Sequence, residues 1–116
     1  MNFAFAYIET IDRLQSGDPL SSITDEELEI TIKCVTHDVH DRIARLNRFP
    51  DARAALEEAS QYDRPTRAKL VPDLWARENA GDALSAEEEA RMALNSFGML
   101  EVLKAEQERR IAGRPN

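Results

Sequence analysis

Apolar residues recur at helical spacing along most of the chain, so the pattern predicts helices rather than strands. The first helix is expected from about Phe3 to Ser16, and Gly17 followed by Pro19 ends it. Its apolar stripe consists of Ala4, Tyr7, Ile8, Ile11 and Leu14. A later helix is expected from about Asp51 to Tyr62, where Ala52, Ala55, Leu56 and Ala59 form a stripe of mostly small residues that suggests a close approach to another helix.

The second helix has a clear start in the sequence. Thr24 is expected at its N-cap, and Glu27 lies three residues later, so that the pair forms a capping box. Pro50 ends the pattern after about Asn47. Six apolar residues fall on one narrow face and predict the core stripe of this helix: Leu28, Ile32, Val35, Val39, Ile43 and Leu46.

The last helix is expected to open with a capping box of Ser85 and Glu88 and to run to about Ile111. One of its apolar stripes consists of Ala86, Ala90, Ala93, Phe97, Leu100 and Ile111, and a second of Met92, Ser96, Met99 and Leu103. An arc this wide predicts a helix at the centre of a bundle. The alternative is a methionine-containing surface that is shared with a partner, including a second copy of the chain.

Two prolines punctuate the segment before that helix. Pro65 and Pro72 each fit the first turn of a helix better than its interior, so two short helices are expected to meet near Val71. Leu70, Val71, Leu74 and Trp75 would anchor them, and Ala80–Gly81 would end the second. The whole pattern predicts an all-α fold: one compact domain over residues 1–116, a bundle of about five helices of which two are short.

Composition agrees with a folded, water-soluble protein. Of the 116 residues, 42% are hydrophobic and 32% are charged. The single cysteine excludes an internal disulfide and fits a reducing compartment. The first residues lack a basic stretch and contain Glu9 and Asp12, so we expect neither a signal peptide nor a membrane span, and therefore a cytoplasmic protein.

The net charge of −7 is unevenly distributed: acids exceed bases in residues 1–41 and 78–116, whereas bases exceed acids in residues 42–77. An acidic surface discourages nonspecific binding to nucleic acids or anionic membranes and favours a basic partner. The central bases could instead bind nucleic acid, and these are Arg42, Arg45, Arg48, Arg53, Arg64, Arg67 and Lys69. Pairing with acids of the same chain explains them as well, and aromatic residues for base stacking make up only 6%.

The only cysteine and both histidines lie within seven residues of the second helix. Cys34, His37 and Asp41 share the face opposite the core stripe, and His40 projects nearby. Structural zinc needs four ligands, and the chain has no other cysteine or histidine to complete a set. Histidine phosphotransfer through an exposed His37 is a further alternative, although the carboxylates of Asp38 and Asp41 would repel a phosphohistidine.

Part of the chain resembles small acidic helical immunity proteins of interbacterial toxin systems. The residues concerned are Cys34, Val35, Ala44, Leu46, Pro50, Ala54, Leu56 and Glu57. They cover about a quarter of the chain, so no residue role is carried over. The resemblance implies inhibition by direct binding to a toxin. Compact acidic phage proteins that block defence nucleases are similar at this level.

We therefore expect a non-catalytic protein-interaction module that needs no cofactor and inhibits a basic protein such as a nuclease or a toxin. The absence of a complete catalytic motif and the acidic ends favour this reading. The residues expected to contact the partner are Asp25, Glu26, Glu29, Asp38, Asp41, Met92, Met99 and Leu103. The alternatives are a phosphotransfer or metal-binding module that uses His37, and a nucleic-acid-binding regulator that uses the region from Arg42 to Lys69.

Overall fold

The computed structural model describes residues 3–114, without the side chains of residues 3–6, 64, 67 and 68. Within this range the chain is helical and contains no strand, which confirms the all-α fold class. The elements are α1 (Phe3–Gln15), the short 3₁₀ helix η1 (Leu20–Ser22), α2 (Asp25–Leu46), α3 (Ala52–Ser60), α4 (Arg64–Asn79) and α5 (Ala86–Ala112). Among the described helices, none combines the length and the apolar character needed to cross a bilayer.

The described chain divides into two compact units. Unit 1 comprises residues up to His37 and from Met99 onward, and unit 2 comprises Asp38–Gly98. The expectation of a single domain stays a prediction.

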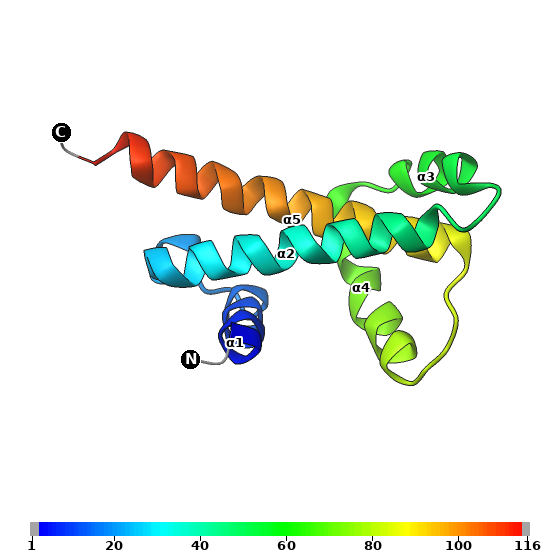
Figure 1. Ribbon diagram of the computed structural model, residues 1–116, viewed down its shortest axis with the longest axis horizontal. Helices are drawn as coiled ribbons and strands as arrows, with labels where there is room; N and C mark the ends of the chain where they lie inside the picture. The colour runs from blue at the N-terminus through cyan, green and yellow to red at the C-terminus, as the bar shows by residue number, and fades with distance from the viewer. Residues whose placement is uncertain (1–2, 115–116) are drawn as a thin grey trace. The chain divides into compact units, whose positions relative to one another are not determined.

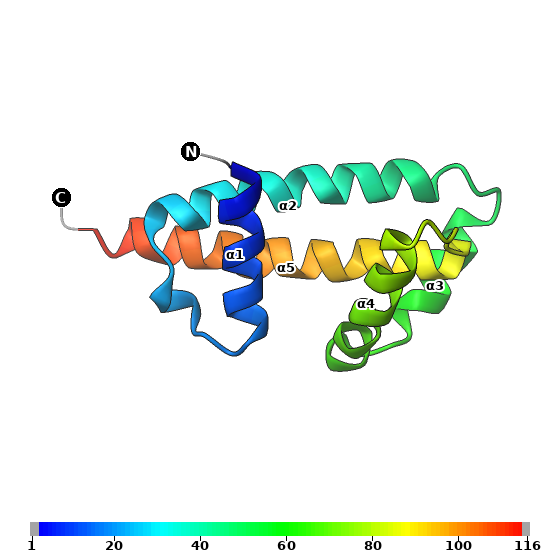
Figure 2. The ribbon, with the colours of Figure 1, turned by 90° about the horizontal axis from the view of Figure 1, so that it is seen from below.

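Unit 1 consists of α1, η1, the first part of α2 and the last part of α5. Figure 2 shows α1 crossing the direction of the two longer helices. The buried apolar residues of this unit are Ile11, Ile23, Leu28, Ile30, Ile32, Val35, Leu100 and Leu103. The predicted stripe of α1 is partly wrong, because Ile8 is 55% exposed and the neighbouring Thr10 is buried in the core. Gly17 has a φ of 99°, the left-handed conformation expected where α1 ends.

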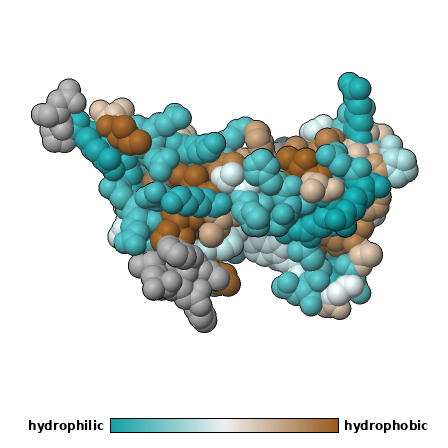
Figure 3. Space-filling model, in the orientation of Figure 1, coloured by the Kyte–Doolittle hydropathy of each residue, from teal (hydrophilic) through white to brown (hydrophobic). Residues whose placement is uncertain are grey.

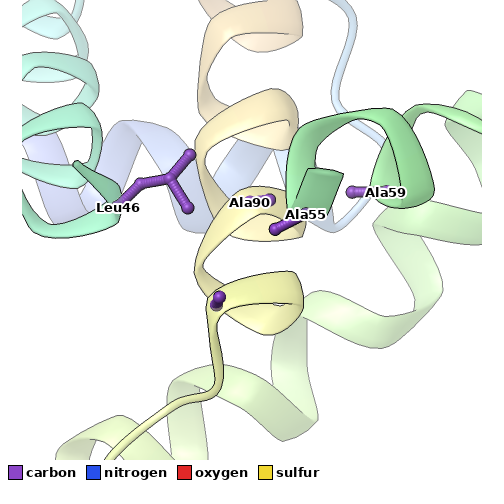
Figure 4. Packing of buried hydrophobic residues seen from close by; sticks show 5 residues of the cluster. Leu46, Ala55, Ala59 and Ala90 are labelled. Atoms are coloured by element: carbon purple, nitrogen blue, oxygen red, sulfur yellow. The ribbon is translucent and has the colours of Figure 1, made fainter. Parts of the chain in front are cut away.

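Unit 2 contains the end of α2, the whole of α3 and α4, and the start of α5. Figure 1 shows α3 and α4 against different sides of α5. The contact with α3 is made by small residues: Leu46 of α2 packs in one cluster with Ala55, Ala59, Ala86 and Ala90 (Figure 4). The alanines of the expected α3 stripe thus lie in this contact, where small side chains allow helices to pack closely, but Leu56 of the same stripe is 36% exposed.

The segment with two prolines forms one helix, not two. Pro65 lies in the first turn of α4 as expected, and the side chain of Asp63 caps that turn by accepting a hydrogen bond from the Thr66 N–H at 2.9 Å. Pro72 lies inside the helix, however, so the expected break near Val71 is wrong. Three of the expected anchors pack in the core of this unit. Val71 and Leu74 form a second core cluster with Leu84 and Met92, and Trp75 packs against it.

The core stripe of α2 is confirmed at five of its six positions, and Ile43 is the exception at 45% exposed. Arg42, the residue before it, is only 4% exposed. A charged side chain therefore occupies a buried position that the hydrophobic pattern did not assign to it.

Both predicted capping boxes are present. The Glu27 N–H donates to Thr24 Oγ1 at 3.0 Å, and the Thr24 N–H donates to Glu27 Oε1 at 2.7 Å. Ser85 and Glu88 make the same reciprocal pair at 3.2 and 2.9 Å. Each box satisfies two backbone donors that would otherwise lack an intrahelical partner.

We expect the substitution Thr24→Ala to lower the free energy of unfolding by about 1 kcal/mol, because it removes the side-chain acceptor at the start of α2. Urea unfolding followed by circular dichroism measures this change. Thr24→Ser keeps a hydroxyl and is expected to stay within a few tenths of a kcal/mol of the wild type. Equal losses in the two variants would contradict the capping role.

Candidate functional site

The histidines of α2 lie at the surface. His37, His40 and Asp41 are exposed, and Cys34 is half-buried. Across the described residues, no three His, Cys, Asp or Glu side chains come together in an arrangement that could hold a metal ion.

The acids expected to face a partner fall into two groups. Asp25 is held within unit 1, where Arg110 Nη1 donates to its Oδ1 at 2.9 Å and Arg114 Nη2 donates to its Oδ2 at 3.1 Å. The hydrogen bond from Arg110 and the two positive charges lower the pKa of Asp25. Glu26 and Glu29, by contrast, are exposed, and the 3.4 Å ion pair of Glu29 with Lys33 is open to solvent.

Asp38 makes two hydrogen bonds inside unit 2. Its Oδ2 accepts a hydrogen bond from Arg42 Nε at 3.0 Å and another from Ser96 Oγ at 2.7 Å. The hydroxyl of Ser96 is thereby engaged with a carboxylate, which fixes α2 against α5. The carboxylate of Asp38 is thus used within unit 2, and a binding partner would have to compete with Arg42 and Ser96 for it.

Arg42 lies at the centre of a group that we call the charge cluster, which consists of Asp38, Arg42, Arg45, Glu78 and Glu89. The guanidinium of Arg42 reaches Glu78 of α4 with two nitrogens, Nη1 to Oε2 at 3.1 Å and Nη2 to Oε1 at 3.4 Å. Arg45 Nη1 donates to the same Oε2 at 3.5 Å. Burial by itself would lower the pKa of Arg42, but the bond to Glu78 and the charges of Asp38 and Glu78 outweigh it and raise the pKa.

Glu89 is the least satisfied member of the charge cluster. It is 7% exposed, and its Oε2 is buried without a hydrogen-bond partner among the described protein atoms. Burial raises the pKa of Glu89, the positive charges of Arg45 and Arg42 oppose that shift, and the negative charges of Glu78 and Asp38 add to it. A second buried polar atom without such a partner is the hydroxyl of Thr10, in unit 1.

An ion pair next to one of the caps also links α4 to α5 in unit 2. Arg77 donates to both carboxylate oxygens of Glu88, the capping residue of α5. The hydrogen bonds from Arg77 and from the Ser85 N–H lower the pKa of Glu88 to about 2. This carboxylate is therefore ionised at any physiological pH.

The methionine-containing stripe of α5 is mostly core. Met92 and Leu103 are each 1% exposed, and Met99 is half-buried. For Met92 and Leu103 this agrees with the core reading of the wide apolar arc, whereas Phe97 and Ile111 of the other stripe are 48% and 55% exposed and do not fit it. A partner cannot reach Met92 or Leu103 without displacing a helix, so these two residues do not fit the predicted contact surface.

Some of the central basic residues form ion pairs within the chain. Arg42 and Arg45 pair with acids of α2 and α4, as the alternative of intramolecular pairing expected, although Glu78 was not foreseen as their partner. Arg48, Arg53 and Lys69 are exposed. Sequence reasoning missed the charge cluster because its partners lie 36 positions apart, and the one available signal was that Arg42 borders the core stripe.

Chemically, the charge cluster binds together helices of unit 2 and presents no activated nucleophile. The hydroxyl of Ser96, next to the cluster, donates to the carboxylate of Asp38, which also accepts a hydrogen bond from Arg42. No model of a known protein family, no curated protein and no solved structure shows significant similarity to this chain.

Proposed function

We propose that this chain is a non-catalytic interaction module that binds and inhibits another protein through exposed acidic side chains of α2. The partner would offer a basic surface, such as the nucleic-acid-binding cleft of a nuclease or a toxin, and both would meet in the cytoplasm. The observation that supports this is the exposure of three acidic residues of this helix, Glu26, Glu29 and Asp41.

Exposed apolar residues also occur on α2. Ala44 is exposed three positions after Asp41, on the same side of the helix, and Ile43 is 45% exposed on the opposite side. On the face of the molecule in Figure 3, brown apolar atoms reach the surface among teal hydrophilic ones. In interfaces of this kind apolar side chains supply most of the affinity, whereas charges speed and select the encounter.

Charge reversal tests the proposal once a partner has been isolated by affinity purification from the native host. In the variant Glu29→Lys/Asp41→Lys we expect the association rate constant to fall about tenfold or more at low ionic strength, and its salt dependence to flatten. Stopped-flow or surface-binding kinetics over a range of salt concentrations provides the measurement.

The matched control is Glu58→Lys/Glu101→Lys, which changes the net charge equally at exposed positions of α3 and α5. It is expected to retain most of the association rate. If both double variants slow association equally, the association rate depends on net charge and not on Glu29 and Asp41 of α2. If neither does, the proposed acidic surface is wrong.

A further inference from the structure

The charge cluster of unit 2 holds more acid than base. With every group ionised, the carboxylates of Asp38, Glu78 and Glu89 face two guanidiniums, Arg42 and Arg45. One negative charge is thus in excess in a region where Arg42 is 4% and Glu89 is 7% exposed. An uncompensated charge is costly to bury, and binding of one proton would remove it.

Hydrogen bonding indicates which carboxylate takes that proton. Asp38 accepts bonds from Arg42 and Ser96, and both oxygens of Glu78 accept bonds from Arg42. Charged or hydroxyl donors of unit 2 thus engage both of these carboxylates. Glu89 has a buried oxygen without such a contact among the described residues, so a proton can bind there with the least loss of hydrogen bonds.

The charged groups that face Glu89 come from two helices. From α2, Arg45 and Arg42 favour its ionised form and Asp38 disfavours it. From α4, Glu78 disfavours the ionised form as well. Burial is the largest influence and acts in the same direction as the two acids.

We propose that Glu89 is a proton-binding site and that its protonation tightens the packing of α4 and α5 in unit 2. The proton removes the repulsion between Glu89 and the carboxylates of Asp38 and Glu78. The two guanidiniums then face two carboxylates, Asp38 and Glu78, instead of three. Through Glu89, mild acidification therefore adds stability to this unit, opposite to the effect of acid on an ion-paired carboxylate such as Glu88.

The pH range follows from the direction of the shift. The pKa of Glu89 lies above its ordinary value of 4.5 in the folded protein, so the folded state binds more protons than the unfolded state between the two values. Stability therefore rises as the pH falls through the folded-state pKa and levels off near 4.5. A single such site changes the folding equilibrium constant by at most about tenfold for each pH unit.

Urea unfolding between pH 7.5 and pH 5 compares the wild type with Glu89→Gln, which mimics the protonated side chain. Glu58→Gln, at an exposed position of α3, is the matched control. We expect Glu89→Gln to be more stable than the wild type at pH 7.5 and the difference to shrink as the pH falls. The control should follow the wild-type curve, since ionisations common to the variants cancel in the comparison.

Calorimetry of the wild type and of Glu89→Gln provides a second readout. Unfolding enthalpies in buffers of different ionisation enthalpy count the protons exchanged, and the difference between the two proteins removes the proton uptake by carboxyls whose pKa is lowered in the fold, such as Asp25 and Glu88. We expect unfolding of the wild type to release more protons, or to take up fewer, than unfolding of Glu89→Gln between pH 7.5 and pH 5. Equal proton counts for the two proteins throughout this range, or parallel stability curves, would overturn the proposal.

Discussion

Arg42→Ala is expected to lower the free energy of unfolding by about 3–5 kcal/mol, which is a large part of the total stability of a domain of this size. The reason is what the substitution leaves behind. Asp38 and Glu78 lose their principal cationic partner while they remain partly enclosed in unit 2. Chemical unfolding at neutral pH, followed by circular dichroism, measures the loss.

Arg45→Ala serves as the matched control for Arg42→Ala. Its side chain is 36% exposed and makes one 3.5 Å contact with Glu78, so we expect a loss below about 1 kcal/mol. Arg42→Lys keeps the charge but cannot reproduce the two-nitrogen contact with Glu78, and an intermediate loss is expected. Similar losses for Arg42→Ala and Arg45→Ala would show that the charge cluster does not depend on Arg42.

Leu103→Ala is expected to lower the free energy of unfolding by about 2–5 kcal/mol. Leu103 is 1% exposed in the core of unit 1, so its truncation removes apolar contacts and leaves a cavity. The same unfolding assay measures the effect. The result also distinguishes a core role for this residue from a role in partner binding, because a surface residue could be truncated at little cost.

Ile111→Ala provides the comparison on the same helix. Ile111 is 55% exposed, and its truncation is expected to cost less than about 1 kcal/mol. A loss as large as that of Leu103→Ala would mean that Ile111 is covered in solution, for example by a second copy of the chain. A small loss for Leu103→Ala would contradict its burial.

Features that depend on neighbours in sequence were predictable. The starts of α2 and α5 follow from a hydroxyl residue and a glutamate three positions apart, and both boxes form as expected. The ends of α1 and α4 follow from Gly17 and Gly81, whose positive φ values are easily adopted by glycine. Such signals act within one helical turn, so they do not depend on the rest of the fold.

The roles of Arg42 and Ile43 were not predictable in the same way. Arg42 borders the predicted core stripe of α2 and Ile43 belongs to it, because hydrophobicity alone assigns the interior to Ile43. In the structure Arg42 is buried and Ile43 is exposed, because Glu78 of α4 provides a carboxylate for Arg42. A single sequence contains no information on which acid, 36 residues away, will face which arginine.

The candidate surface was only partly predictable for the same reason. Composition identifies an excess of acids at the start of the chain, but not which of them the fold itself uses. Asp25 and Asp38 turn out to bind arginines of the same chain, whereas Glu26 and Glu29 remain exposed. For Met92 and Leu103, the width of the apolar arc left two readings, and their burial decides for the core.

The proline inside α4 has a mechanical consequence. Because Pro72 has no N–H, the carbonyl of residue 68 cannot receive the usual helical hydrogen bond. The helix therefore lacks one backbone hydrogen bond at this turn. Bending at this turn deforms fewer backbone bonds than bending anywhere else in α4. If a bound protein forces α4 to change its curvature, the hinge is expected at Pro72, with Arg64–Val71 and Asp73–Asn79 moving as rigid arms.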